Sequence, residues 1–447
     1  MVYLKTWLLF FRVLFVYFFS SNKTSPYYLA GKHLLSLSFR YPEKDKKSFI
    51  AFIKAFVKSL LLGKMSMDKA VSVYSPSHIF FYEMFKNDPL NNESMRLAQI
   101  KYFTNKAMNG SIWKEGLLGY QTLSDKLLQL IFEPILFVGL FPIALFKKIR
   151  GPVGLIFSEY IELVNLLKLL KKYQVKELYF SSIYEKDSNI ASIAIKRLGI
   201  NIIKIASLTP LKFWNSIIVA TDTLALSDIN QLEEVKQFSD TIQAQKVELW
   251  GPEDIAEVAQ HYEDVKDSVK STNVIGLYST AGYIRTLEGN LEQNIDGYAK
   301  KINEYLVEYM TNHKGLKLII FLHPIEKNPK YKQIVKDYYA SFFEGLNYTI
   351  WESKLNSSHC FEVADLGVAF HSSVMYERLY FGFKCLWMSF GKDGIEMPES
   401  IQSICAIDKA DFFAKMDRFL NMSWEEYFNS TGVKKSPFLL KREAAKS

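Results

Sequence analysis

Short runs of β-branched and aromatic residues alternate with longer amphipathic segments from about residue 150 to the end of the chain. A first series of such runs stands at residues 175–180, 202–205, 217–220 and 247–250, and a second at 274–278, 316–322, 348–351, 366–370 and 385–388. Strands that alternate with helices are typical of a mostly parallel sheet covered by helices. The pattern therefore predicts an α/β chain with two Rossmann-like domains facing a cleft.

The boundaries follow from changes in composition along the 447 residues. A polar, helix-forming segment at 253–270 separates the two series of strands. We expect a basic, apolar, mainly helical N-terminal region at 1–150, as part of the first lobe. A first Rossmann-like domain is expected at 151–271, and a second, with C-terminal helices, at 272–447.

Positive charge is concentrated at the N-terminal end of the chain. Residues 1–64 contain 11 Lys and Arg but only two acids, a net charge of +9, out of +8 for the whole chain. Within them, residues 48–64 form an amphipathic pattern with Lys54 and Lys58 on the polar face. Such a helix suits an anionic membrane surface, or alternatively packs on the core of its own domain. Charge confined in this way does not predict a nucleic-acid partner.

Two apolar runs bear on the location of the protein. Residues 1–20 are borderline for a spanning helix and are interrupted by Lys5 and Arg12, while 130–146 is short and broken by prolines. Buried core is the favoured reading of the second run, with a membrane-dipping segment as the alternative. Three cysteines fit a reducing compartment. We expect a cytoplasmic protein bound peripherally to the inner face of the cell membrane.

Polar residues follow three strands of the second domain, at the sheet edge where open α/β folds bind ligands. They are Ser279, Thr280, Gly282 and Arg285 after the first strand, His323 and Pro324 after the second, and His371, Ser372, Ser373 and Glu377 after the third.

The chemistry of these residue types suits a nucleotide. Ser372 and Ser373 begin a helix, whose free N–H groups and dipole favour a phosphate, and Glu377 can accept hydrogen bonds from ribose hydroxyls. His323 can donate to a phosphate or to the leaving-group oxygen. The alternatives are ordinary helix capping by the two serines and a structural role for His371.

The order strand-His-Pro, then strand-His-Ser-Ser-helix-Glu, with His323 and His371 48 residues apart, resembles the donor-binding half of bacterial GT-B glycosyltransferases. It is most similar to the CMP-sugar-using sialyltransferase and polysialyltransferase groups. That resemblance covers the second domain and implies that His323, Pro324, Ser372 and Ser373 contact the nucleotide. The layout also resembles UDP-sugar epimerases and CDP-glycerol transferases.

The general base is not marked by a motif. The CMP-sialic acid families carry two acids followed by glycine in the first domain, and residues 1–271 lack this triplet. The nearest acidic loop after a strand contains Glu185 and Asp187, which we take as candidate bases, with Glu159 as a further one. The alternative is a solvated loop acid, or a helix cap for Asp187.

No cofactor or metal is expected, because the sequence contains no Asp-x-Asp triplet, HxxxH pair or Gly-rich phosphate loop. The combined prediction is an inverting, metal-independent glycosyltransferase. It would move a sugar, in the first place a sialic-acid-like one, from a nucleotide-sugar donor to a bacterial surface glycan or lipid-linked glycan. The alternatives are a nucleotide-sugar epimerase, a polyol-phosphate transferase, or a non-catalytic GT-B-like subunit of polysaccharide assembly.

Overall fold

The computed structural model divides the chain into two compact units, each described by itself below. The described residues are 2–36, 70–74, 79–83, 99, 102, 113–116, 131, 135, 163–164, 166–180, 188–206, 217–252, 255–264, 273–288, 295–352, 357–370, 372–391 and 397–444. The first unit takes residues 1–206, 216–225 and 238–248, and the second takes 207–215, 226–237 and 249–447.

The first unit is built on a seven-stranded sheet with the order β3-β1-β2-β4-β5-β6-β7. Its strands are β1 (Ala70–Tyr74), β2 (Ile79–Glu83), β3 (Trp113–Gly116), β4 (Glu177–Phe180), β5 (Asn201–Ile205), β6 (Ile218–Leu226) and β7 (Ile242–Leu249). β2, β4, β5 and β6 pair in parallel, whereas β1 is antiparallel to both β2 and β3. The region expected to be mainly helical thus also supplies three strands.

Helices α1 (Val2–Phe19), α2 (Pro26–Ser36) and α7 (Ser188–Lys196) share one apolar core with β4 and β5. No helix in the described part of the chain is both long and apolar enough to cross a bilayer. The helix expected at 48–64 lies outside the described residues. Of the apolar run at 130–146, Ile131 and Ile135 are described and both are exposed, so burial does not hold at those two positions.

The second unit is built on a six-stranded sheet in which every pairing is parallel, with the order β10-β9-β8-β11-β12-β13. Its strands are β8 (Val274–Tyr278), β9 (Lys317–Phe321), β10 (Tyr348–Trp351), β11 (Leu366–Ala369), β12 (Lys384–Met388) and β13 (Cys405–Ala406). Counted along the chain, this is the order 3-2-1-4-5-6 of a Rossmann fold. The predicted class, α/β with two Rossmann-like units, is confirmed.

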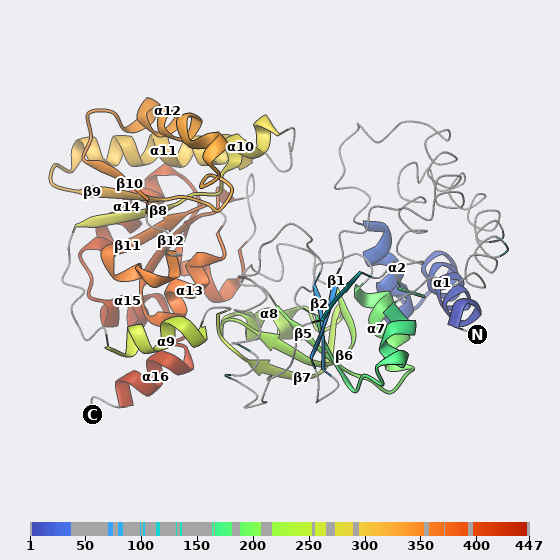
Figure 1. Ribbon diagram of the computed structural model, residues 1–447. Helices are drawn as coiled ribbons and strands as arrows, with labels where there is room; N and C mark the ends of the chain where they lie inside the picture. The colour runs from blue at the N-terminus through green and yellow to red at the C-terminus, as the bar shows by residue number, and fades with distance from the viewer. Residues whose placement is uncertain are drawn as a thin grey trace. The chain divides into compact units, whose positions relative to one another are not determined.

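Helices cover both faces of this sheet. Figure 1 shows α10 (Gly282–Leu287), α11 (Ile295–Asn312) and α12 (Lys332–Phe343) together on one side, and α13 (Val374–Phe381) with α9 (Ile255–Asp264) and α16 (Pro437–Ala444) on the other. The remaining helices of the described segments include α8 (Gln231–Gln237), α14 (Lys409–Leu420) and α15 (Trp424–Thr431). Strands with both faces covered are buried throughout, which is why β11 and, after its first residue Lys384, β12 consist of apolar residues.

A buried arginine holds the centre of the second unit. Arg378 of α13 is fully buried, and it donates to the Tyr278 hydroxyl and to the carbonyls of Phe361, Ala364 and Lys384 at 2.9–3.3 Å. All five guanidinium N–H groups are thereby used. Gly367 passes directly beneath, where a Cβ atom would lie 2.5 Å from Arg378 Nε. This glycine is therefore required by close approach.

We predict that Arg378→Met destabilises the protein by about 3 kcal/mol or more, because it leaves three buried carbonyls and a hydroxyl without their donor. Urea unfolding followed by circular dichroism measures the loss. Arg418→Met on α14, where the arginine is exposed, is the matched control and should cost within about 0.5 kcal/mol. Equal stability of the two variants would show that Arg378 does not hold this centre together.

Candidate functional site

The candidate site lies at the edge of the second sheet where the strand order reverses. β8 and β11 are adjacent in the sheet although β9 and β10 lie between them in the chain. Such a switch point leaves a crevice beyond the carboxyl ends of the two strands, because the connections leave in opposite directions. Three of the predicted polar segments begin at this edge, after β8, β9 and β11.

The turn after β8 is held tightly by its own polar atoms. Ser279 donates its backbone N–H to the Phe321 carbonyl at 3.0 Å, and its hydroxyl accepts from the N–H of Ala281 at 3.1 Å. Ala281 adopts a left-handed conformation, with φ of 53°, to start α10. At Gly282 a Cβ atom would lie 2.8 Å from the backbone N of Asp296, so this glycine serves the packing of α10 on α11.

Arg285 and His323 come together from different strand ends. Arg285 Nε donates to the Thr280 carbonyl at 3.2 Å, and its Nη2 lies 3.3 Å from Nε2 of His323. His323 Nδ1 accepts the backbone N–H of Ile325 at 3.2 Å. The guanidinium of Arg285 and the imidazole of His323 thus form one hydrogen-bonded pair between the ends of β8 and β9. An anionic oxygen bound by both is the arrangement this geometry favours.

Behind the histidine lies a carboxylate that sequence reasoning missed. Glu326 is 2% exposed, and it accepts from the hydroxyls of Tyr283 and Tyr339 at 2.8 and 2.9 Å and from the backbone N–H of His323 at 2.7 Å. Burial raises the pKa of its carboxyl, and the hydrogen bonds oppose that rise. An acid three residues after His323 was the available signal, since it can reach back to the histidine N–H.

The residues of the third segment are only partly described. Ser372 and Ser373 are half-buried at the start of α13, and the Ser373 side chain does not cap the helix. Glu377 is half-buried in the first turn. His371 lies outside the described residues, as do Glu185, Asp187 and Glu159. Pro324 is exposed beside His323.

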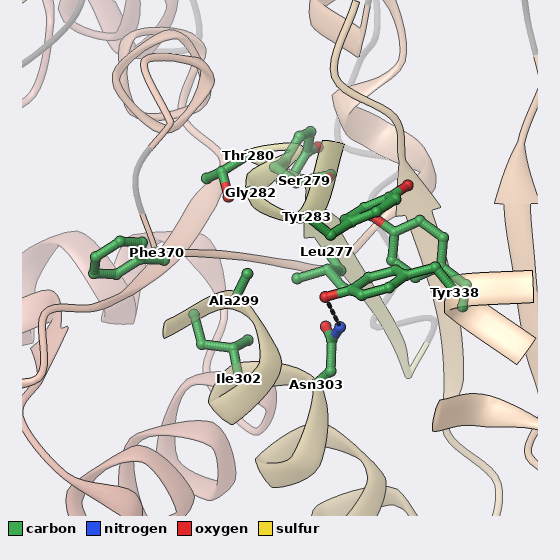
Figure 2. A pocket seen from close by; sticks show the side chains of 12 residues that line it. Leu277, Ser279, Thr280, Gly282, Tyr283, Ala299, Ile302, Asn303, Tyr338 and Phe370 are labelled. Carbon is green, nitrogen blue, oxygen red and sulfur yellow. Dashed lines mark hydrogen bonds between the residues drawn. The ribbon is translucent and has the colours of Figure 1, made fainter. Parts of the chain in front are cut away.

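A small void lies between this turn and the helices α11 and α12. It is lined by Ser279, Thr280, Tyr283, Asn303 and Tyr338 among others, and it encloses about 20 Å³, roughly the room for one water molecule. Figure 2 shows Asn303 reaching the Tyr338 hydroxyl, which accepts from its Nδ2 at 3.3 Å. Thr280 points its buried Oγ1 here, without a hydrogen-bond partner among the described residues. Thr280 therefore belongs to the floor of the turn.

Other reactive side chains of the second unit are buried and inert. Burial raises the pKa of the Cys360 and Cys385 thiols to about 12, which keeps them protonated as the sequence predicts. Tyr376 and Tyr380 are buried, as expected of packing residues. Across the described ranges, no group of three His, Cys, Asp or Glu side chains gathers in a way that could hold a metal ion.

No protein-family model matches this sequence, and no characterised protein matches it in sequence. Among solved structures, Staphylococcus aureus MnaA with UDP is similar at 10% identity and a TM-score of 0.44, over 80% of this chain and 91% of that one. Neisseria meningitidis UDP-GlcNAc 2-epimerase bound to UDP-GlcNAc is similar at 14% identity and a TM-score of 0.41, over 66% and 83% of the two chains. Acinetobacter baumannii MurG is similar at 13% identity and 0.33, over 66% and 74%. These similarities concern the fold alone and identify no substrate.

A second buried carboxyl, at Asp228 after β6, predicts a pH dependence of stability. Burial is the largest effect on it and raises its pKa from 3.8 to about 6, against hydrogen bonds from Asn230 and Ile229. Burial disfavours the ionised carboxylate of Asp228 in the folded state. The contribution of Asp228 to the unfolding free energy is therefore complete below pH 3.8 and is lost as the pH rises through about 6.

We therefore expect the unfolding free energy of Asp228→Asn, relative to that of the wild type, to rise by about 2 kcal/mol between pH 4 and pH 7. The asparagine keeps an oxygen that accepts the Asn230 N–H but does not ionise. Denaturant unfolding at four pH values measures the difference. Asp240→Asn, at an exposed position, is the matched control for the substitution. A flat difference for Asp228→Asn would contradict the assignment.

Proposed function

We propose that this chain is an inverting, metal-independent glycosyltransferase of GT-B type that uses a nucleotide-sugar donor. The observation that carries the proposal is the pairing of two basic side chains, Arg285 Nη2 and His323 Nε2, 3.3 Å apart, at the switch point of a Rossmann-type sheet. A phosphate oxygen of the donor would sit between them. A CMP-sugar is the first choice, because of the resemblance of the His-Pro and His-Ser-Ser segments, and a UDP- or GDP-sugar the second.

The neighbouring strand end would complete the nucleotide site. The α13 N-terminus would supply N–H groups and a partial positive charge, to which Ser372 and Ser373 would add their hydroxyls; the Ser373 hydroxyl does not cap the helix. Glu377, one turn further, would accept hydrogen bonds from the ribose, and His371 would face the same crevice. Ser279, Thr280 and Gly282 would shape the site mainly through the backbone of their turn.

The proposed reaction is a direct displacement. The acceptor hydroxyl oxygen forms the new bond to the anomeric carbon while the bond from that carbon to the nucleotide phosphate oxygen breaks. Asp187 or Glu185 of the first unit, or else Glu159, would take the acceptor proton. Arg285 and His323 would stabilise the negative charge that develops on the leaving phosphate.

The acceptor is proposed to be a bacterial surface glycan or a lipid-linked glycan. The basic residues 1–64 would hold the enzyme at the inner face of the cell membrane, where an acceptor on a lipid carrier is found. The domain boundaries at 150/151 and 271/272 remain part of this proposal.

Calorimetric titration with CMP, CDP, UDP and GDP tests the site directly. We expect one of these nucleotides to bind, and His323→Ala or Arg285→Met to weaken it by roughly 10- to 100-fold, as expected when a charge-assisted hydrogen bond is lost. His313→Ala, at an exposed histidine at the end of α11, is the control and should bind like the wild type. Absence of binding to all four nucleotides would contradict the proposal.

Product analysis separates transfer from the alternative reactions on the same fold. We expect no turnover of the donor by the enzyme alone beyond slow hydrolysis, and loss of glycan synthesis in cells that carry only His323→Ala. Conversion of the donor without an acceptor would instead identify an epimerase. Unchanged synthesis with His323→Ala would identify a non-catalytic subunit.

A further inference from the structure

Helix α1 presents apolar side chains on two opposite faces. Its inner face contributes Leu9, Phe10, Val13 and Leu14 to the core of the first unit. Its outer face carries five large side chains whose exposed fractions lie between 44% and 68%: Leu4, Leu8, Phe11, Phe15 and Phe19. Solvent exposure of so many adjoining apolar groups is unusual on a soluble surface and indicates an interaction site.

The exposed residues form one continuous stripe, called here the outer stripe of α1. Their spacing of three or four residues places them on a single side of the helix. The rings of Phe11 and Phe15 lie 6.4 Å apart between centroids, and those of Phe15 and Phe19 lie 5.0 Å apart. From Leu4 to Phe19 the stripe runs for about 22 Å along the surface.

The chain segment that carries the outer stripe holds positive charges and no negative ones. Lys5, Arg12, Lys23 and Lys32 are all exposed, and the first 42 residues of the chain contain no Asp or Glu. The Arg12 guanidinium lies over the Tyr27 ring at 4.2 Å, next to the stripe. A second copy of this chain would bring the same cations together, which repulsion disfavours. An anionic lipid surface instead offers an apolar interior to the stripe and negative headgroups to the cations beside it.

We propose that the outer stripe of α1 docks the protein on an anionic membrane, with the helix lying in the plane of the interface. The opposite face of α1 is already packed into the core, so lipid cannot surround the helix. Phe11, Phe15 and Phe19 enter the boundary between headgroups and acyl chains, while Lys5 and Arg12 remain at the level of the phosphates. This inference does not depend on the proposed glycosyltransferase activity.

Vesicle flotation of the full chain tests the docking. We expect binding to phosphatidylcholine vesicles with about 30% phosphatidylglycerol, weaker binding to pure phosphatidylcholine, and partial release by salt. Phe11→Ser combined with Phe15→Ser should weaken binding to the anionic vesicles by roughly 10- to 100-fold, from the apolar area no longer buried. Undiminished binding by this double variant would overturn the proposal.

The matched control is Leu287→Ser combined with Ile407→Ser, which removes two apolar side chains of similar exposure (64% and 56%) from the second unit. It should bind vesicles like the wild type, and equal loss with both double variants would overturn the proposal. Sedimentation velocity without lipid tests whether a second copy of this chain covers the stripe instead. A wild-type dimer that the Phe11→Ser and Phe15→Ser variant converts to monomer would assign the stripe to a second copy.

A labelled variant keeps the test decisive even where serine substitutions perturb folding. The three native cysteines are buried, so an environment-sensitive fluorophore can be attached selectively to Phe15→Cys. We expect a blue shift of its emission with anionic vesicles and none with neutral ones. The same label on Ile407→Cys should not shift. An unchanged emission at position 15 would overturn the proposal.

Discussion

The guanidinium of Arg378 is the constraint on which the second unit depends. It donates to the hydroxyl at the end of β8 and to carbonyls before β11 and at the start of β12, so one side chain of α13 fixes the helix against three strands. A charge buried this completely is tolerated because every donor has an acceptor. The first turn of α13, with Ser372 and Ser373, is thereby placed at the switch point.

Glu326 holds the other half of the candidate site. Its carboxylate gathers donors from α10, α12 and the His-Pro turn, and so ties His323 to the helices behind it. Both halves of the candidate site are thus held by buried ionisable side chains, each satisfied by hydrogen bonds. A low-dielectric surrounding makes such networks rigid, so they fix the geometry of the groups beside them.

The rule that ligand-binding residues follow the strands finds the right segments of the chain, but it does not say which residue in a segment binds and which only packs. His323 and Arg285 converge as a binding pair needs to. Gly282 and Thr280, chosen by the same rule, respectively pack against α11 and point a buried hydroxyl into a water-sized void. In the first unit, α1 combines a core face with an exposed apolar stripe, so one apolar run serves two surfaces.

The sequence by itself determined the α/β class, five of the six strands of the second unit and the polar segments at its strand ends, because period, β-branched content and glycine positions are local signals. Only the tertiary structure decided the strand order, the partners of Arg378 and the burial of Glu326 behind His323. Those depend on which strands become neighbours and on contacts such as Tyr339–Glu326 and Tyr278–Arg378, 13 and 100 positions apart, which no local pattern encodes. The same reason separates the two faces of α1, since its sequence is apolar all round and only packing selects the face that is covered.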